Sequence, residues 1–363
     1  MQKIFKQVAG IDVAQKELVV CLGRLTTELQ VELYAHKSFP NSEKGFTALV
    51  AWAQRCSQAS LPVRYVMEAT GVYHEALAYH LAQSGEVVSI VLPSKIAHYV
   101  KTLELKTITD KTASEAICRF GVERTLEGWQ PPSPVYRKLR ALTREREQLV
   151  AERTAVKNQL HAEEAEAHGG ASTIKRLKKR IALLDQQERE ISADIEKLLK
   201  SEEKTSALST LLKTIPGVGT LTAATVLGET DGFALIRNSR QLVSYAGLDV
   251  KEKESGTSVR MRPRISKKGN RYLRKSLHFP ALTAVRTDPH FKGFFARLVS
   301  RHGIKMKAAV AVQRKLLQLM FTLYKTGVPY EEHYWANRQT GAAEKTKEKA
   351  AEIIKEPSSL SAP

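Results

Sequence analysis

Apolar side chains recur at every third or fourth position from residue 135 to residue 199, and this pattern constrains the fold more than any other in the chain. Its members are Val135, Leu139, Leu142, Leu149, Val156, Leu160, Ile174, Leu177, Ile181, Leu184, Ile191, Ile195 and Leu198. Arg146, Arg153 and Glu188 fill three further positions of the same seam. The spacing is typical of a coiled coil, and Gly169–Gly170 at its centre predicts an antiparallel helical hairpin.

The apolar stripe on these helices is too narrow for one helix to bury alone. At about 1.5 Å per residue, the second helix, residues 172–199, would be about 40 Å long. The stripe must therefore pair within the chain, between chains, or both. We expect this arm to serve dimerisation.

Before the arm, segments of strand and helix character alternate, which favours an α/β domain with a central sheet over residues 1–128. Gly85 is expected to end a helix and Pro93 to end a strand. The predicted strands are 8–13, 17–22, 63–68 and 86–93, and the predicted helices are 46–56 and 73–85.

Composition sets the remaining boundaries in this chain of 363 residues, a length that suits two or three domains. The stretch "EGWQPPSP" (127–134) is typical of a linker, so linker and arm occupy residues 129–205. Residues 206–335 are predicted to be helical. Residues 336–363 are polar and poor in aromatic residues, which predicts a disordered tail.

Three carboxylates stand where a central sheet could bring them together. Asp12 and Glu68 each follow an apolar strand, and Asp110 opens an amphipathic helix bearing Ile117 and Phe120. Such acids repel one another unless a divalent cation neutralises them, and oxygen ligands suit Mg²⁺ or Mn²⁺. The alternative is that Asp12 is a solvated turn residue in a surface hairpin.

The charge of the chain points to a polyanionic partner. A formal net charge of +19 accompanies a hydrophobic fraction of 42%, which is sufficient for globular cores. Lysine and arginine displace the counterions condensed on phosphates, so such an excess is typical of nucleic-acid binding. A soluble protein that is basic for other reasons is the alternative.

The N-terminal stretch and the cysteine spacing argue against a secreted protein, a membrane protein and a zinc ribbon. The beginning "MQKIFKQVAG" lacks the apolar core of a signal peptide, and no apolar run is long enough to span a bilayer. Cys21, Cys56 and Cys118 are too far apart for a zinc ribbon and odd in number. We expect a cytoplasmic, reduced protein with no membrane contact, in which two of the thiols are buried.

The stretch "LLKTIPGVGTLTAATVL" has the form of a helix-hairpin-helix. Gly217 and Gly219 would let backbone amides approach a phosphate beside the next helix's N-terminus. A tight turn between two packed helices is the alternative.

The most basic stretch runs from Lys251 to Lys275 and carries ten Lys or Arg against two Glu. Its interleaved Gly, Ser and Asn suit phosphate contacts on loops rather than a packed core. The candidate nucleic-acid-binding residues are Arg260, Arg262, Arg264, Lys267, Lys268, Asn270, Arg271 and Arg274.

Several motifs resemble DEDD-type insertion-sequence transposases of the insertion-sequence-110 class. In the first part these are "GIDVAQKELVVCL", "MEATGVYHEALAYHL", "VLPSKI" and "TDKTASEAICRFG". In the last part they are "IPGVGTLTAATVLGE", "FALIRNSRQLVSYAGL", "ESGTSVRMRPRISKKGNRYLRKSL" and "KAAVAVQRKLL". The resemblance covers most of residues 8–330 and implies a ribonuclease-H-like (resolvase-like) first domain followed by a helical transposase domain.

The resemblance maps the family's acidic set onto Asp12, Glu68, Asp110 and a fourth aspartate at position 113, where this chain has Ala113. Residues i and i+3 share a helix face, so alanine removes one ligand, and Glu115 lies on another face. We therefore expect two-metal chemistry to be impaired.

The resemblance also implies that Ser255, which precedes Gly256, is the covalent nucleophile on DNA. Ser258 and Ser266 are the less favoured alternatives. An isolated serine needs activation, which a metal or a basic residue brought in by folding could supply. The acids and Ser255 would then form one composite site across two domains or two subunits.

Members of the family are described as recombinases guided by a structured bridge RNA, so DNA (donor and target) and an RNA are the expected partners. Base pairing would select the sequence, while the protein reads shape and backbone. Since recombination joins two duplexes, we expect a homodimer or homotetramer.

Two other functions remain open at this point. One is a Holliday-junction or repair nuclease that uses metal-activated water and no covalent serine. The other is a non-catalytic nucleic-acid scaffold, which Ala113 favours.

Overall fold

The computed structural model describes residues 4–69, 71–103, 107, 109–167, 169–252, 254–255, 259–260, 264–331 and 334–335. The chain separates into two compact units, Met1–Pro131 and Pro132–Pro363, each described by itself below. None of the helices in the described ranges is long and apolar enough to cross a membrane.

The first unit is a mixed five-stranded sheet with the strand order β3-β2-β1-β4-β5. The first three strands pair antiparallel, whereas β4 and β5 run parallel to β1. Strand bounds are β1 Ile4–Val13, β2 Glu17–Thr26, β3 Val31–Pro40, β4 Val63–Glu68 and β5 Val87–Val91. Helix bounds are α1 Glu43–Cys56, α2 Glu75–Gln83, α3 Pro93–Val100 and α4 Asp110–Glu123.

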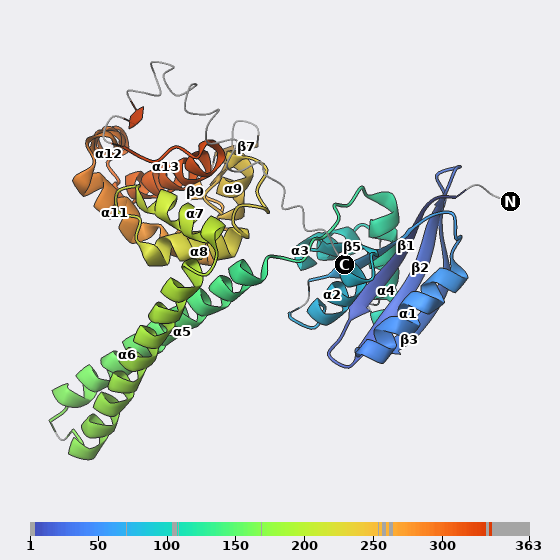
Figure 1. The fold of residues 1–363 in the computed structure, drawn as a ribbon, viewed down its shortest axis with the longest axis horizontal. Helices are drawn as coiled ribbons and strands as arrows, with labels where there is room; N and C mark the ends of the chain where they lie inside the picture. The colour runs from blue at the N-terminus through green and yellow to red at the C-terminus, as the bar shows by residue number, and fades with distance from the viewer. Residues whose placement is uncertain are drawn as a thin grey trace. The chain divides into compact units, whose positions relative to one another are not determined.

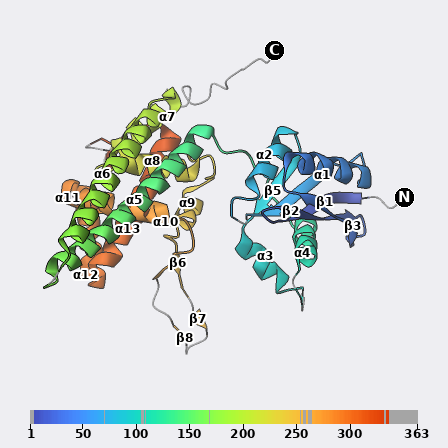
Figure 2. The same ribbon diagram turned by 90° about the horizontal axis from the view of Figure 1, so that it is seen from below.

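Alternation along the strands gives each face of the sheet its own core. Ile11 and Tyr65 join the apolar residues of α1 and α2, while Val8 and Val66 join those of α3 and α4. Figure 2 shows the two helix pairs on opposite faces of the sheet. The predicted α/β architecture of the first part is confirmed.

Helix α4 approaches the sheet very closely at Gly10. A Cβ built on Gly10 would lie 2.3 Å from the backbone nitrogen of Cys118, so no larger residue fits here without displacing the helix. Cys21 and Cys118 are buried free thiols in this interface, as predicted, and Cys56 is exposed.

The second unit begins with two long helices, α5 (Pro134–Ala165) and α6 (Ala171–Leu199), which form a hairpin (Figure 1). Val156, Leu177 and Leu184 form a small apolar cluster between them. Charged residues of the seam also meet across the hairpin: Glu188 pairs with both Arg146 and Arg153.

The rest of the second unit is mostly helical, as predicted, and its helices share one apolar core with the base of α5 and α6. The helices are α7 Glu203–Lys213, α8 Thr220–Thr230, α9 Ser239–Tyr245, α10 Arg271–Ser276, α11 His278–Thr287, α12 Pro289–His302 and α13 Lys305–Thr326. The short strands are β6 Val250–Lys251, β7 Glu254–Ser255, β8 Val259–Arg260 and β9 Arg264–Ile265.

Two elements of the first unit were not predicted. Strand β3 carries half-exposed side chains along most of its length, and its sequence "VELYAHKSFP" has no apolar run. The second unpredicted element is helix α3. Pro93 follows a strand, as expected, but it is also the first residue of α3, a position where its missing N–H costs nothing.

Candidate functional site

Asp12 and Glu68 lie side by side at the carboxyl ends of two parallel strands. The register pairs Gly10 with Val66 and Ile11 with Met67, so the next residues along are Asp12 and Glu68. Side chains alternate along a strand, which puts both carboxylates on the face that carries Val8 and α4. Asp12 is therefore part of a core strand and not a solvated turn residue.

Asp110 reaches the same face from the start of α4. The helix begins there because Thr109 caps it: the Thr109 hydroxyl accepts from the Thr112 backbone, and the Thr112 hydroxyl accepts from the Thr109 backbone. The capping box fixes the first turn, and with it the direction from which Asp110 approaches.

Asp12 lies close enough to the other two carboxylates to be repelled by both. Burial raises the pKa of Asp12 above its ordinary value, and the charges of Asp110 and then Glu68 raise it further. Among the described His, Cys, Asp and Glu residues, however, no group of three or more is gathered tightly enough to hold a metal ion.

Ala113 lies one turn into α4, where its backbone N–H bonds to the carbonyl of Thr109. Together with Glu68, it borders a hollow of about 480 Å³ whose wall is mostly apolar. The wall comes from α3 and α4 and comprises Pro93, Ser94, Ile96, Ala97, Val100, Lys101, Thr112 and Ile117. Glu115 instead pairs with His36 of β3 at 3.0 Å, so it points away from Glu68's hollow.

Sequence reasoning missed the contribution of α3 to this hollow. Only Pro93 could have indicated it, because proline is common at the first position of a helix as well as after a strand.

In the second unit, Gly217 and Gly219 lie in the turn between α7 and α8 but have different surroundings. Gly217 has φ +86°, and a Cβ on it would lie 2.5 Å from the carbonyl oxygen of Pro280 in α11. Gly217 therefore supports packing between helices. Gly219 is the N-cap of α8, and a Cβ there would have nothing within 4 Å.

Ser255 is the last residue of β7 and pairs with Val259 of β8. The side chains of Ser255 and Arg260 lie outside the described part of the chain, as do Arg262, Gly256 and Ser258 as whole residues. Ser266, the other alternative nucleophile, donates its hydroxyl to Asp249 at 2.6 Å.

The predicted nucleic-acid contacts divide into exposed and engaged side chains. Arg264, Lys267 and Lys268 are exposed, and so is Arg271, although it also donates to the Tyr272 hydroxyl at 3.1 Å. In contrast, Asn270 caps α10, and its amide donates to the Glu229 carboxylate at 2.6 Å.

Arg274 is also engaged in holding the fold. It donates to the carbonyl oxygens of Ala246 at 2.8 Å and Gly269 at 3.3 Å. The sequence could not distinguish the exposed side chains from those that bond within the fold, because both kinds occur in the same basic stretch.

Two family profiles match the chain. A profile of DEDD-type IS110 transposases matches residues 9–163, and one described as the transposase IS116/IS110/IS902 family matches residues 209–296. The first match covers most of the first unit and continues through most of α5, and the second match lies within the second unit. Their order along the chain is the one that the sequence motifs predict.

Curated relatives extend the similarity over nearly the whole chain. The pilin gene-inverting protein of Moraxella bovis is 28% identical over 330 residues, covering 90% of this chain and 98% of that protein. The transposase for insertion sequence element IS1328 of Yersinia enterocolitica is 27% identical over 281 residues, covering 70% of this chain and 81% of that protein.

Among solved structures, RuvC of T. thermophilus in complex with a Holliday junction substrate aligns with 34% of this chain and 100% of its own, with a TM-score of 0.26 and 13% identity.

Proposed function

Because the chain belongs to the IS110 family of transposases, we propose that it is the recombinase of an insertion sequence, cutting and exchanging DNA strands. The observation that carries this proposal is the meeting of Asp12, Glu68 and Asp110 on one face of the sheet, where burial and mutual repulsion raise the pKa of Asp12. Carboxylates placed in this way favour a cation between them.

We propose that the divalent cation on which such transposases depend is Mg²⁺ or Mn²⁺, held by Asp12, Glu68 and Asp110. The chemistry of the donor set fits, since all three side chains offer the hard oxygen ligands that these ions prefer, and the three would have to draw closer together to share one ion. When bound, such an ion stabilises negative charge on a phosphate in displacement. With Ala113 in the fourth position, this form is expected to be impaired or inactive.

Ser255 is the proposed nucleophile, on the strength of the family resemblance. Its hydroxyl oxygen would form a bond to phosphorus while the bond from phosphorus to one sugar oxygen breaks. That oxygen leaves as a hydroxyl after taking up a proton, and the strand end remains esterified to the serine. Rejoining reverses the same exchange with a different strand end.

The proposed division of labour follows three parts of the chain. Residues 1–128 form a ribonuclease-H-like catalytic domain, residues 129–205 a linker with a coiled-coil arm, and residues 206–335 a helical domain with the helix-hairpin-helix and the serine. The surplus of basic residues supports DNA as ligand and, we propose, a bridge RNA as guide.

The arm supports assembly into a homodimer or homotetramer. Its seam keeps Leu149, Leu160 and Ile181 only partly buried within one chain, which leaves apolar surface for a second copy.

Trapping a covalent protein–DNA adduct tests the chemistry. The Ala113→Asp variant, which restores the fourth carboxylate, is incubated with donor and target DNA, guide RNA and Mg²⁺ or Mn²⁺. We expect an adduct that survives denaturation and disappears in Ala113→Asp/Ser255→Ala. Cleavage without an adduct would favour the metal-activated-water nuclease, and normal binding without any cleavage would favour the scaffold.

A further inference from the structure

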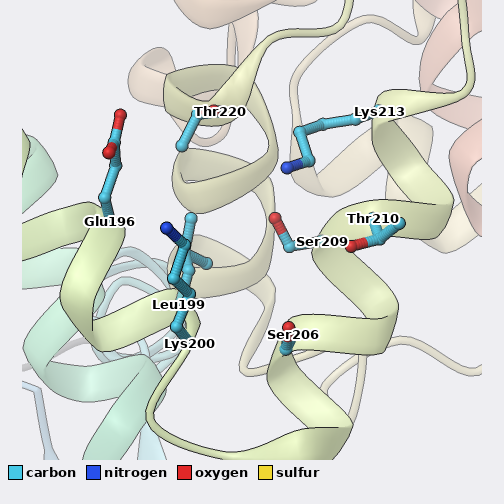
Figure 3. Close-up of a pocket in the computed structure, with 8 residues that line it drawn as sticks. All are labelled: Glu196, Leu199, Lys200, Ser206, Ser209, Thr210, Lys213 and Thr220. Atoms are coloured by element: carbon cyan, nitrogen blue, oxygen red, sulfur yellow. The ribbon is translucent and has the colours of Figure 1, made fainter.

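A pocket of about 200 Å³ lies where α6, α7 and the start of α8 meet (Figure 3). Seven of its eight lining residues are polar or charged, and Leu199 is the one apolar residue among them. The lining residues are Glu196, Leu199, Lys200, Ser206, Ser209, Thr210, Lys213 and Thr220.

Ser209 in this wall is buried without a hydrogen-bond partner. The residue is 3% exposed, and its hydroxyl has none among the described residues. Neighbouring hydroxyls behave differently: those of Thr214 and Thr225 donate to backbone carbonyls of their own helices at 2.7 and 2.8 Å. An unpaired buried hydroxyl is costly, which is expected where a ligand supplies the missing partner.

Two lysines face the same space. Figure 3 shows the amines of Lys200, from the end of α6, and Lys213, from the end of α7, directed into the pocket on either side of Ser209. Neither amine forms an ion pair with any residue that the structure describes. With Glu196 also in the lining, the pocket carries two ammonium groups against one carboxylate and is positive on balance.

The start of α8 adds a further attraction for an anion. Gly219 caps this helix of 11 residues without any side-chain hydrogen bond, and Thr220, its first residue, lines the pocket. The first N–H groups of a helix lack partners within the helix and carry the positive end of its dipole.

We propose that this pocket binds one phosphodiester group of a nucleic-acid backbone. The inference rests on the proposed function, in which the chain acts on nucleic acid. Two ammonium groups, a free hydroxyl and an uncapped helix start match the charge and acceptor oxygens of a phosphate. A metal ion suits the pocket poorly, because Glu196 is the one carboxylate in the lining. An apolar ligand suits it poorly as well, because Leu199 is the one apolar lining residue.

Glu196 opposes the ligand. Its carboxylate belongs to the lining of the pocket and repels a phosphate, so it sets the affinity below the maximum that the lysines allow. Because Glu196 acts in the opposite direction from Lys213, substitutions of the two residues give results of opposite sign.

Binding of fluorescent duplex DNA and of the guide RNA to the full chain tests the lysines. Lys213→Gln is expected to weaken binding about tenfold, the loss of one charged hydrogen bond, and to lower the salt slope by about one contact. The matched control is Lys204→Gln, which removes the same charge from the same helix outside the pocket. The duplex and RNA arms identify which backbone supplies the phosphate.

Ser209→Ala and Glu196→Gln complete the test. Ser209→Ala should weaken binding about tenfold, the loss of one hydrogen bond to a charged acceptor, without lowering the melting temperature. Its control, Ser192→Ala, removes a hydroxyl that donates to the carbonyl of Glu188 at 2.7 Å, and should leave binding unchanged. Glu196→Gln should tighten binding.

Equal effects of Lys213→Gln and Lys204→Gln, or unchanged binding by Ser209→Ala, would overturn the proposal that this pocket binds a phosphate. The proposed function would remain intact. Failure of the unaltered chain to bind either nucleic acid would overturn both.

Discussion

Arg144 and Glu229 form a two-pronged salt bridge in the second unit. The Nε of Arg144 donates to one carboxylate oxygen of Glu229 at 2.7 Å, and its Nη2 donates to the other at 2.8 Å. The Glu229 side chain is fully buried, and Asn270 donates to it as well. This contact fixes α5 of the arm to α8.

Loss of Arg144 should therefore destabilise the second unit. Arg144→Leu leaves the fully buried Glu229 carboxylate with Asn270 alone, and a buried charge that loses its ionic partner costs up to about 3 kcal/mol. Urea unfolding should show this decrease, and Arg189→Leu, at an exposed position of α6, should change the unfolding free energy far less. Equal effects of both substitutions would contradict a stabilising role for the pair.

Replacing all three charged residues of the arm's seam, Arg146, Arg153 and Glu188, should destabilise the hairpin less than replacing Glu188 alone. Glu188→Leu alone leaves Arg146 without its ion-pair partner and Arg153 with Asp185 alone, and it should lower the unfolding free energy by about 3 kcal/mol. Replacing all three residues by leucine should recover most of that loss, because the one charge left without its partner, Asp185, is 41% exposed to solvent. A triple variant less stable than Glu188→Leu would show that the ion pairs themselves stabilise the hairpin.

The repulsion around Asp12 predicts a pH-dependent gain from its removal. Since the pKa of Asp12 is raised in the folded state, its ionisation costs stability above that pKa, and the cost disappears as the pH falls through it. Asp12→Asn should raise the melting temperature at pH 7, and the gain should shrink in acid. A gain that is the same at both pH values would place its cause elsewhere.

Mg²⁺ should affect Ala113→Asp more than the unaltered chain. A fourth carboxylate beside the other three adds repulsion, so the variant should melt at a lower temperature without divalent cations and rise further when they are added. Ala113→Asn has the same shape without the charge and should respond to Mg²⁺ like the unaltered chain. Thermal melts with and without Mg²⁺ measure both effects.

The sequence predicted those parts of the fold and site that depend on local patterns. Asp12 and Glu68 could be found because each ends an apolar strand, and Asp110 because it opens an amphipathic helix. Strand β3 could not be predicted, because an edge strand with half-exposed side chains has no apolar alternation to detect.

Contacts distant in sequence were also beyond prediction. Asn270 and Lys268 occur in the same basic stretch, yet only the fold directs Asn270 to Glu229, 41 positions away. Ser209 looks like any other helix serine until its burial and missing partner are known. Local pattern thus identifies candidates, and tertiary packing decides which of them have a free polar group.

Gly10 contributes to the carboxylate cluster by having no side chain. Even a methyl group there would act as a wedge between β1 and α4, levering the helix outward at Cys118. Because Asp110 travels with that helix while Asp12 stays with the strand, the wedge would part the two acids. Gly10, which has no side chain, therefore sets the distance between the carboxylates of Asp12 and Asp110.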